Sequence, residues 1–92
     1  MPSYLVETYL PRGQAGERNA RERRARSAAE ELTQGRTAVR FDGSIHVPED
    51  EICFFVFDAP SGQTAALAAQ LAGLGATRVV EAISSGNEKE EK

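Results

Sequence analysis

The sequence predicts an α+β fold in which four strands form one antiparallel sheet and two helices cover one of its faces. Residues 51–61 contain six consecutive apolar or aromatic residues, a run too short for a helix and rich in strand-forming side chains. Residues 15–32 and 62–74 have helical composition, and strand-like segments flank each of them. The resulting order is strand, helix, strand, strand, helix, strand.

The apolar run is predicted to be a central strand, because alternate side chains put apolar groups on both of its faces. The two faces consist of Ile52, Phe54 and Val56 on one side and Cys53, Phe55 and Phe57 on the other. Since neither face can be left in water, the sheet needs a cover on both sides. We expect this chain's helices to cover one side and a second copy of the chain to cover the other.

The first half of the chain supplies a strand, a helix and a second strand. Residues 4–10 form the first strand, with Glu7 and Tyr9 on the face away from the helices. The helix at 15–32 should end at Gln34-Gly35. Its arginines are interpreted as a solvated face held by ion pairs between neighbouring helical turns. The expected pairs are Glu17/Arg21, Glu22/Arg26 and Arg26/Glu30.

Residues 37–47 alternate between apolar and polar side chains, with a bulge or bend at Gly43. Ser61 is the expected N-cap of the second helix, 62–74. That helix carries a stripe of Leu67, Leu71 and Leu74. The last strand is expected at 77–83. Residues 1–83 are therefore predicted to form a single domain and residues 84–92 a disordered tail of charged residues.

Right-handed crossovers within the two strand–helix–strand halves give a ferredoxin-like arrangement, with the first and third strands central. The sheet face that the helices leave uncovered is the candidate site. It is predicted to carry Glu7, Tyr9, Arg40, Asp42, Ser44, His46, Cys53, Phe55, Phe57 and Glu81. An apolar surface of this kind marks a partner or a ligand. Two such faces packed as a homodimer would enclose a barrel-like chamber.

Composition excludes several function classes. The chain has 92 residues and a formal charge of −3, and three of its carboxylates lie in the last five residues, so neither nucleic-acid nor membrane binding is predicted. The single cysteine rules out an internal disulfide, and a buried free thiol suits a reducing cytoplasm. We find no signal peptide, no spanning apolar run and no phosphate-binding glycine loop. A cytoplasmic location is expected.

Several segments resemble a family of small, mostly actinobacterial proteins of unknown function. They are Tyr4-Leu5-Val6-Glu7, the Arg- and Ala-rich helix, Pro48-Glu49-Asp50-Glu51 before Cys53-Phe54, and Phe57-Asp58-Ala59-Pro60-Ser61. The resemblance covers nearly the whole chain up to Ile83. It implies a ferredoxin-like fold that pairs as a dimer, and one described relative binds nickel. Histidines are the usual nickel ligands, and this chain offers only His46, so no ligand set is carried over.

A divalent metal ion, nickel by the resemblance, is one candidate ligand, with His46, Glu7 and Cys53 as the candidate donors. The alternative interpretation makes His46 a partly exposed residue with a local hydrogen bond and Cys53 a small buried hydrophobe. Glu7 and Glu81 interrupt apolar strands that are expected to be neighbours. They would form either an acid–base pair or, with Arg40 or Arg78, a structural ion-pair network, which we favour.

The predicted function is that of a small binding protein for a metal ion or a small organic ligand at the open sheet face of a homodimer. The candidate ligand-binding residues are Glu7, Tyr9, Arg40, Ser44, Phe55, Phe57 and Glu81. A second hypothesis is a cofactor-free enzyme of the dimeric α+β barrel type, such as an isomerase, cyclase or monooxygenase, with Glu7, His46 or Glu81 as acid or base. A third is a subunit that docks a different protein through its sheet face.

Overall fold

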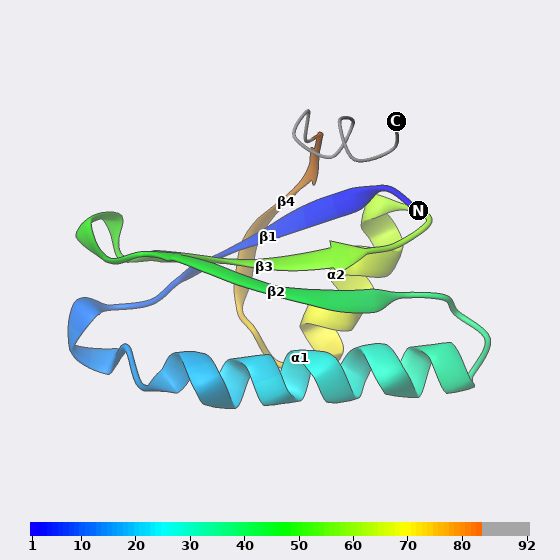
Figure 1. Cartoon of the computed structure of the whole chain (residues 1–92), viewed down its shortest axis with the longest axis horizontal. Coiled ribbons are helices and arrows are strands. Elements are labelled where there is room, and N and C mark those ends of the chain that lie inside the picture. The colour runs from blue at the N-terminus through cyan, green and yellow to red at the C-terminus, as the bar shows by residue number, and fades with distance from the viewer. Residues whose placement is uncertain (84–92) are drawn as a thin grey trace, which may run out of the picture.

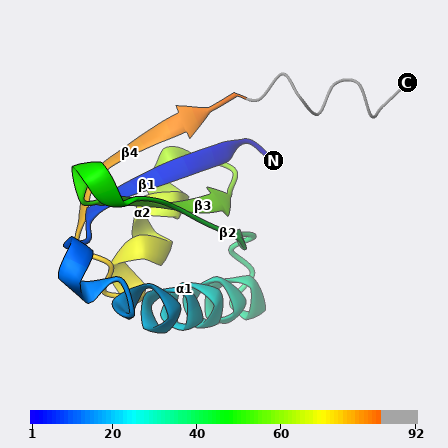
Figure 2. The same ribbon diagram turned by 60° about the vertical axis from the view of Figure 1, so that its left-hand side comes forward.

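The computed structural model describes residues 1–83 and contains one four-stranded antiparallel sheet in the order β2-β3-β1-β4 (Figure 1). The strands are β1 (Ser3–Tyr9), β2 (Arg40–Val47), β3 (Ile52–Asp58) and β4 (Ala76–Ala82). Helices α1 (Glu17–Gln34) and α2 (Gly62–Leu71) lie on the same side of this sheet (Figure 2). The ferredoxin-like prediction is confirmed, whereas the predicted tail, 84–92, lies outside the described residues.

Local sequence signals set three boundaries where they were expected, whereas α1 spans 17–34 and not 15–32, and α2 ends at Leu71 and not at Leu74. Ser61 caps α2, because its hydroxyl accepts a hydrogen bond from the Thr64 backbone N–H at 3.2 Å. Gly35 follows α1, and its N–H bonds back to the Glu31 carbonyl at 3.1 Å. A short 3₁₀ turn, Pro48–Asp50, links β2 to β3 and makes the two strands an antiparallel hairpin.

The expected bulge at Gly43 is present, and it reverses the orientation of the rest of β2. Phe41 pairs with Phe57, but Gly43 pairs with the next residue, Val56, so Asp42 is the extra residue. Gly43 adopts a φ of 124°, a conformation that glycine reaches without strain. Beyond the bulge, Gly43, Ile45 and Val47 turn away from the helices.

The core lies between the sheet and the helices, and its central members are Cys53, Phe55 and Phe57, all fully buried. The Phe41 ring packs on them, with its centroid 5.4 Å from that of Phe57. The predicted orientation of β3 was therefore wrong by one residue. The opposite face of β3 ends in Asp58, whose carboxylate requires polar partners that an apolar core does not supply.

Helix α2 also faces the sheet differently from the prediction. Its buried residues are Ala65, Ala68 and Ala69, whereas Leu67 and Leu71 are 43% and 49% exposed. Of the predicted leucine stripe, Leu74 alone is buried. An alanine face lets the helix backbone approach the aromatic side chains of the sheet closely, and the core is filled from the strand side.

The arginines of α1 fasten the helix to the rest of the fold. Arg18 donates to the Ser44 hydroxyl at 2.8 Å, Arg21 to the Tyr9 carbonyl at 3.0 Å, and Arg24 to the Ala72 carbonyl at 2.8 Å. None of the three expected ion pairs forms among the described residues, where the ion pair within α1 is Arg18–Glu22 at 4.0 Å. The expected ion pairs were therefore wrong, whereas Arg23, Arg24 and Arg26 are exposed, as the solvated-face interpretation predicts. Within residues 1–83, no helix is long and apolar enough to cross a membrane.

The inward alanine face of α2 predicts opposite outcomes for two substitutions. Ala68→Leu should lower the free energy of unfolding by roughly 1–3 kcal/mol, because Ala68 is fully buried and a larger side chain overpacks the core. Leu71→Ala should change it by less than about 1 kcal/mol, since Leu71 is exposed. Alanine and leucine have similar helix propensities, so the comparison isolates packing. Urea unfolding measures both, and a larger loss for Leu71→Ala would contradict the orientation.

Candidate functional site

The sheet face away from the helices is the candidate site, and we call it the open face. Strand register places its side chains in four rows across the sheet. They are Arg40, Asp58, Ser3 and Ala82; Gly43, Val56, Leu5 and Val80; Ile45, Phe54, Glu7 and Arg78; and Val47, Ile52 and Tyr9. The middle rows are mostly apolar, and charged groups gather near the ends of the strands.

The apolar part of the open face has no cover among the described residues. Ile45 and Tyr9 are 52% and 59% exposed, and Phe54 and Val56 remain partly exposed at the centre of the sheet. Gly43 deepens the surface beside Val56, since no atom lies within 4 Å of where a Cβ would stand. Large apolar side chains exposed together on one face indicate a surface that binds something.

A polar cluster forms one end of the open face. The Arg40 guanidinium donates to Asp58 at 2.5 Å and to Asp42 at 2.9 Å, and the Ser3 hydroxyl donates to Asp58 at 2.6 Å. The Asp58 side chain is 10% exposed and that of Asp42 is 31% exposed. The bulge at Gly43 places Asp42 beside this row, which brings two carboxylates to one guanidinium.

The two carboxylates of this cluster differ in acidity. Burial alone would raise the pKa of Asp58, but hydrogen bonds from Asp42, Ser3 and Arg40 outweigh it, and the pKa is lowered. For Asp42, burial and the hydrogen bond with Asp58 raise the pKa above its ordinary value, and Arg40 opposes this only in part. The two neighbouring carboxylates therefore have pKa shifts of opposite direction.

The other end of the open face carries a second set of polar groups. Arg78 lies 3.6 Å from the Glu7 carboxylate, and the Tyr9 hydroxyl lies 3.4 Å from a carboxylate oxygen of Glu51. A pocket of about 340 Å³ opens here, bordered by Glu7, Thr8, Tyr9, Ile52 and Thr77. The ion-pair network expected for Glu7 and Glu81 forms only in part, because Arg78 pairs with Glu7 while Arg40 pairs with Asp42 and Asp58.

The structure brings part of the predicted ligand-binding set together on the open face, namely Glu7, Tyr9 and Arg40. The remaining predicted ligand-binding residues do not lie on the open face. Phe55 and Phe57 belong to the core, and Ser44 faces α1, where it contacts Arg18 and Glu22. Glu81 is also on the helix side, opposite Tyr4, because the register with β1 puts Arg78 and Val80 on the open face instead.

The candidate metal donors do not converge. His46 pairs with Cys53 on the helix side, whereas Glu7 lies on the open face. Among residues 1–83, no group of three or more His, Cys, Asp or Glu side chains is placed to hold a metal ion. The Nε2 atom of His46 is buried without a hydrogen-bond partner in the same part of the chain. One chain's described residues therefore do not fit a nickel site.

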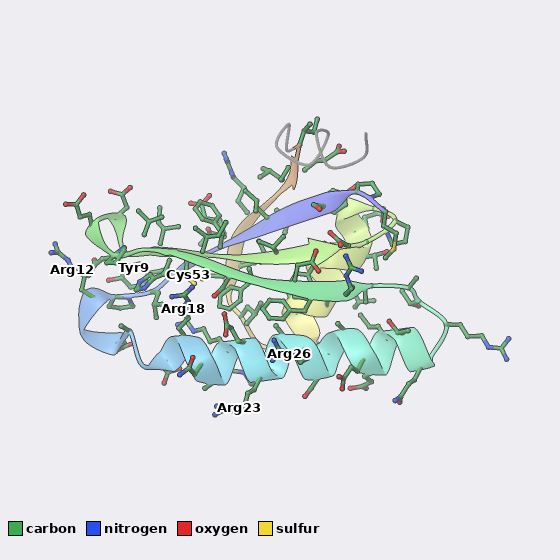
Figure 3. All side chains as sticks on the ribbon, viewed as in Figure 1. Tyr9, Arg12, Arg18, Arg23, Arg26 and Cys53 are labelled. Atoms are coloured by element: carbon green, nitrogen blue, oxygen red, sulfur yellow. The ribbon has the colours of Figure 1, made fainter. Side chains whose placement is uncertain are left out.

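Cys53 is enclosed by the sheet and α1. Its side chain is fully buried, and burial raises the pKa of its thiol, although the nearby Arg18 opposes the shift. The Thr8 hydroxyl bonds to the Cys53 carbonyl at 2.8 Å and satisfies the strand backbone. Figure 3 shows Cys53 on the sheet above Arg18. These features favour the interpretation of Cys53 as a small core residue.

Sequence reasoning missed the residues that dominate the open face, above all Phe54, Val56 and Asp58. A signal was present, because Asp58 continues the alternation of Phe54 and Val56 and a carboxylate at that position favours the solvent side. The inversion of Ser44 and His46 followed from treating β2 as a regular alternation through Gly43. The sequence indicates a bulge or bend at Gly43, but it does not show which side of the sheet the residues after Gly43 face.

No protein-family model matches this chain, and no curated protein does either. Among solved structures it is similar to the crystal structure of SCO4226 from Streptomyces coelicolor A3(2), with a TM-score of 0.67 and 17% sequence identity. The similarity covers 90% of this chain and 98% of that chain. This similarity supports the ferredoxin-like fold.

The lowered pKa of Asp58 gives a pH dependence that Asp58→Asn should reveal. Above about pH 4 the ionised carboxylate stabilises the fold through Arg40 and Ser3, and this contribution is lost as the pH falls through the folded-state pKa. The variant should lose roughly 1–3 kcal/mol at pH 7, as expected for hydrogen bonds to a charged group, and much less at pH 3. Urea unfolding at both pH values measures the difference.

The matched control is Asp50→Asn, because Asp50 is exposed in the turn between β2 and β3. It should show little loss at either pH. An Asp58→Asn loss that is the same at pH 3 and pH 7 would contradict the role of the carboxylate charge.

Proposed function

We propose that this chain is a small binding protein that acts as a homodimer, in which two open faces meet and enclose a chamber for a small organic ligand. The observation that carries the proposal is the apolar centre of the open face. Phe54, Val56 and Leu5 lie there on the two central strands, and both helices cover the opposite side of the sheet. This face has the composition of a buried surface.

Charge favours a second copy as the cover. The ionic groups of the open face are paired within one chain, Glu7 with Arg78 and Arg40 with Asp42 and Asp58. The face therefore has little net charge, and two copies would meet without strong like-charge repulsion. The open face therefore lacks the excess of one charge that would attract a nucleic acid or a strongly charged protein.

The dimensions of the sheet allow a specific interface. Four strands of seven or eight residues span roughly 19 by 24 Å, or about 450 Å² in projection. The accessible area of a side-chain surface exceeds its projection, and specific interfaces begin at about 600 Å² per partner. Pairing would thus use most of the open face. Its chamber would lie where side chains leave space, beside Gly43 and beside the pocket at Glu7 and Tyr9.

The chemistry of the walls indicates the ligand class. The floor is mostly aliphatic and aromatic, with the paired Glu7 and Arg78 in the row of Phe54 and the Arg40 cluster at one end. Such a chamber suits a mostly apolar molecule with a polar group that hydrogen-bonds at one end. The buried free thiol of Cys53 agrees with a reducing, cytoplasmic environment for this protein.

One observation favours a second candidate, the cofactor-free enzyme. Asp42 and Asp58 are neighbouring carboxylates with opposite pKa shifts, the arrangement that separates an acid from a base. On this proposal Asp42 donates a proton to a ligand at the open face and ionised Asp58 accepts one. Of the earlier acid–base candidates, His46 and Glu81 lie on the helix side of the sheet, and within residues 1–83 Glu7 has no second carboxylate beside it on the open face.

Native mass spectrometry of untreated protein tests the proposal. Wild type should be a dimer that carries a stoichiometric organic adduct, and denaturing conditions should release the adduct. Phe54→Glu should give a folded monomer without adduct, because it places a charge at the centre of the interface. Leu67→Glu is the matched control, since Leu67 is exposed on α2, and it should remain a dimer.

A wild-type monomer would overturn the homodimer and favour docking to a different protein. A dimer that persists in Phe54→Glu would place the interface elsewhere.

Added nickel, zinc and copper separate the two ligand classes, a metal ion and an organic molecule. Stoichiometric metal on the dimer would replace the organic ligand by a metal ion, and its loss in His46→Ala would place that metal on the helix side of the sheet, outside the interface.

A further inference from the structure

A second pocket lies on the helix side of the sheet, along the edge strand β2. It measures about 340 Å³ and is formed by the second half of α1 and the chain that enters β2. The lining residues that matter are Arg26, Ala29, Glu30, Thr33, Val39 and Phe41. The apolar rows of the open face do not contribute to this pocket, and Arg40, at the sheet edge, is the residue that borders both sites.

The floor of the pocket is apolar and fixed. Ala29, Val39 and Phe41 are at most 9% exposed, and their buried sides belong to the core. The Thr33 hydroxyl donates to the Val39 carbonyl at 2.9 Å and accepts from the Val39 N–H at 3.3 Å. This double hydrogen bond ties the end of α1 to the start of β2, so the pocket is formed before any ligand arrives.

Arg26 supplies a positive charge without a protein acceptor. Its guanidinium carbon lies 5.4 Å from the centroid of the Phe41 ring, and no hydrogen bond or ion pair joins Arg26 to another residue in 1–83. Arg18, Arg21 and Arg24 each donate to an oxygen of the fold. A guanidinium stacked on an aromatic ring keeps its edge N–H groups free for a carboxylate.

Glu30 supplies the opposite charge one helical turn later. The spacing of four residues places Arg26 and Glu30 on the same side of α1, yet no ion pair within 4.0 Å joins them. Arginine before glutamate is the weaker order for such a pair in a helix. The pocket's other arginine, Arg40, is engaged by Asp42 and Asp58. The floor is therefore flanked by one cation and one anion that lack protein partners in the described chain.

We propose that this pocket binds a small zwitterion with an apolar body, the chemistry of an apolar α-amino acid. The ligand carboxylate pairs with the edge of the Arg26 guanidinium, and its ammonium group pairs with Glu30. Its side chain lies on Ala29, Val39 and Phe41. The volume is at the small end of ligand pockets, which suits a single amino acid and excludes a nucleotide or a larger cofactor.

The test is an amide ¹H–¹⁵N NMR titration of the full chain with L-phenylalanine, 3-phenylpropionate and phenethylamine. L-phenylalanine should shift the resonances of residues 26–41 and should bind more tightly than the two analogues, each of which lacks one charge. Arg26→Gln should weaken L-phenylalanine binding by about tenfold or more. Glu30→Gln should remove the preference for L-phenylalanine over 3-phenylpropionate.

Arg23→Gln is the matched control, because Arg23 projects from the side of α1 away from the sheet, whereas Arg26 lies between α1 and the sheet (Figure 3). It should bind like wild type. Three results would overturn the proposal: no shifts up to about 10 mM ligand, shifts confined to the open face, or equal binding of the three compounds. If Arg26→Gln does not fold, Glu30→Gln still decides the zwitterion assignment. This outcome is independent of whether the protein is a dimer.

Discussion

The constraint on which the structure depends is that β3 is apolar on both faces. Cys53, Phe55 and Phe57 point toward the helices and form the centre of the core, and Phe54 and Val56 point the other way. One chain has two helices, and the crossovers place both on the same side of the sheet. The chain therefore satisfies half of its own hydrophobic requirement. The open face is the consequence, and the proposed homodimer is the simplest way to cover it.

The helix layer shows how a small chain builds its core from the sheet side. The buried surfaces of both helices are mostly alanine, represented by Ala25, Ala28, Ala65 and Ala68, so the aromatic residues of β2 and β3 supply the volume. Alanine contributes little attraction by itself. The arginines of α1 compensate by donating to the sheet and to the end of α2 through directed hydrogen bonds. Arg26, which stacks on Phe41 without an acceptor, departs from that pattern and suggests a role in binding.

The sequence predicted the element order, the sheet topology and several local features. Ser61 as an N-cap, the bulge at Gly43 and the stop at Gly35 were found because each depends on a residue and its immediate neighbours. The side of the sheet that each residue faces was harder to predict. The prediction for β3 was displaced by one residue. It therefore assigned Phe55 and Phe57 to the open face and left Phe54 out, because the orientation of a strand depends on its pairing with distant strands. Local patterns carry little information on that pairing.

The candidate sites follow from the same geometry. Glu7, Tyr9 and Arg40 were placed correctly because β1 pairs regularly with β3 and Arg40 precedes the bulge in β2. Asp58 and Arg78 were missed because their importance comes from partners across the sheet, Arg40 and Glu7. The Arg26 pocket was missed for a related reason. Helical spacing suggested that Arg26 pairs with a glutamate of its own helix. In the structure the Arg26 guanidinium lies over the Phe41 ring of β2 instead.

The most direct test of the open face as an interface is an isotope-filtered NOE measurement on a mixture of ¹³C-labelled and unlabelled protein. In such a sample, contacts between labelled and unlabelled groups arise between copies of the chain. The account predicts intermolecular contacts from the methyl groups of Leu5, Val56 and Val80 to the Phe54 ring. Intermolecular contacts from Leu67 or Leu71 on α2, with none from the open face, would contradict it.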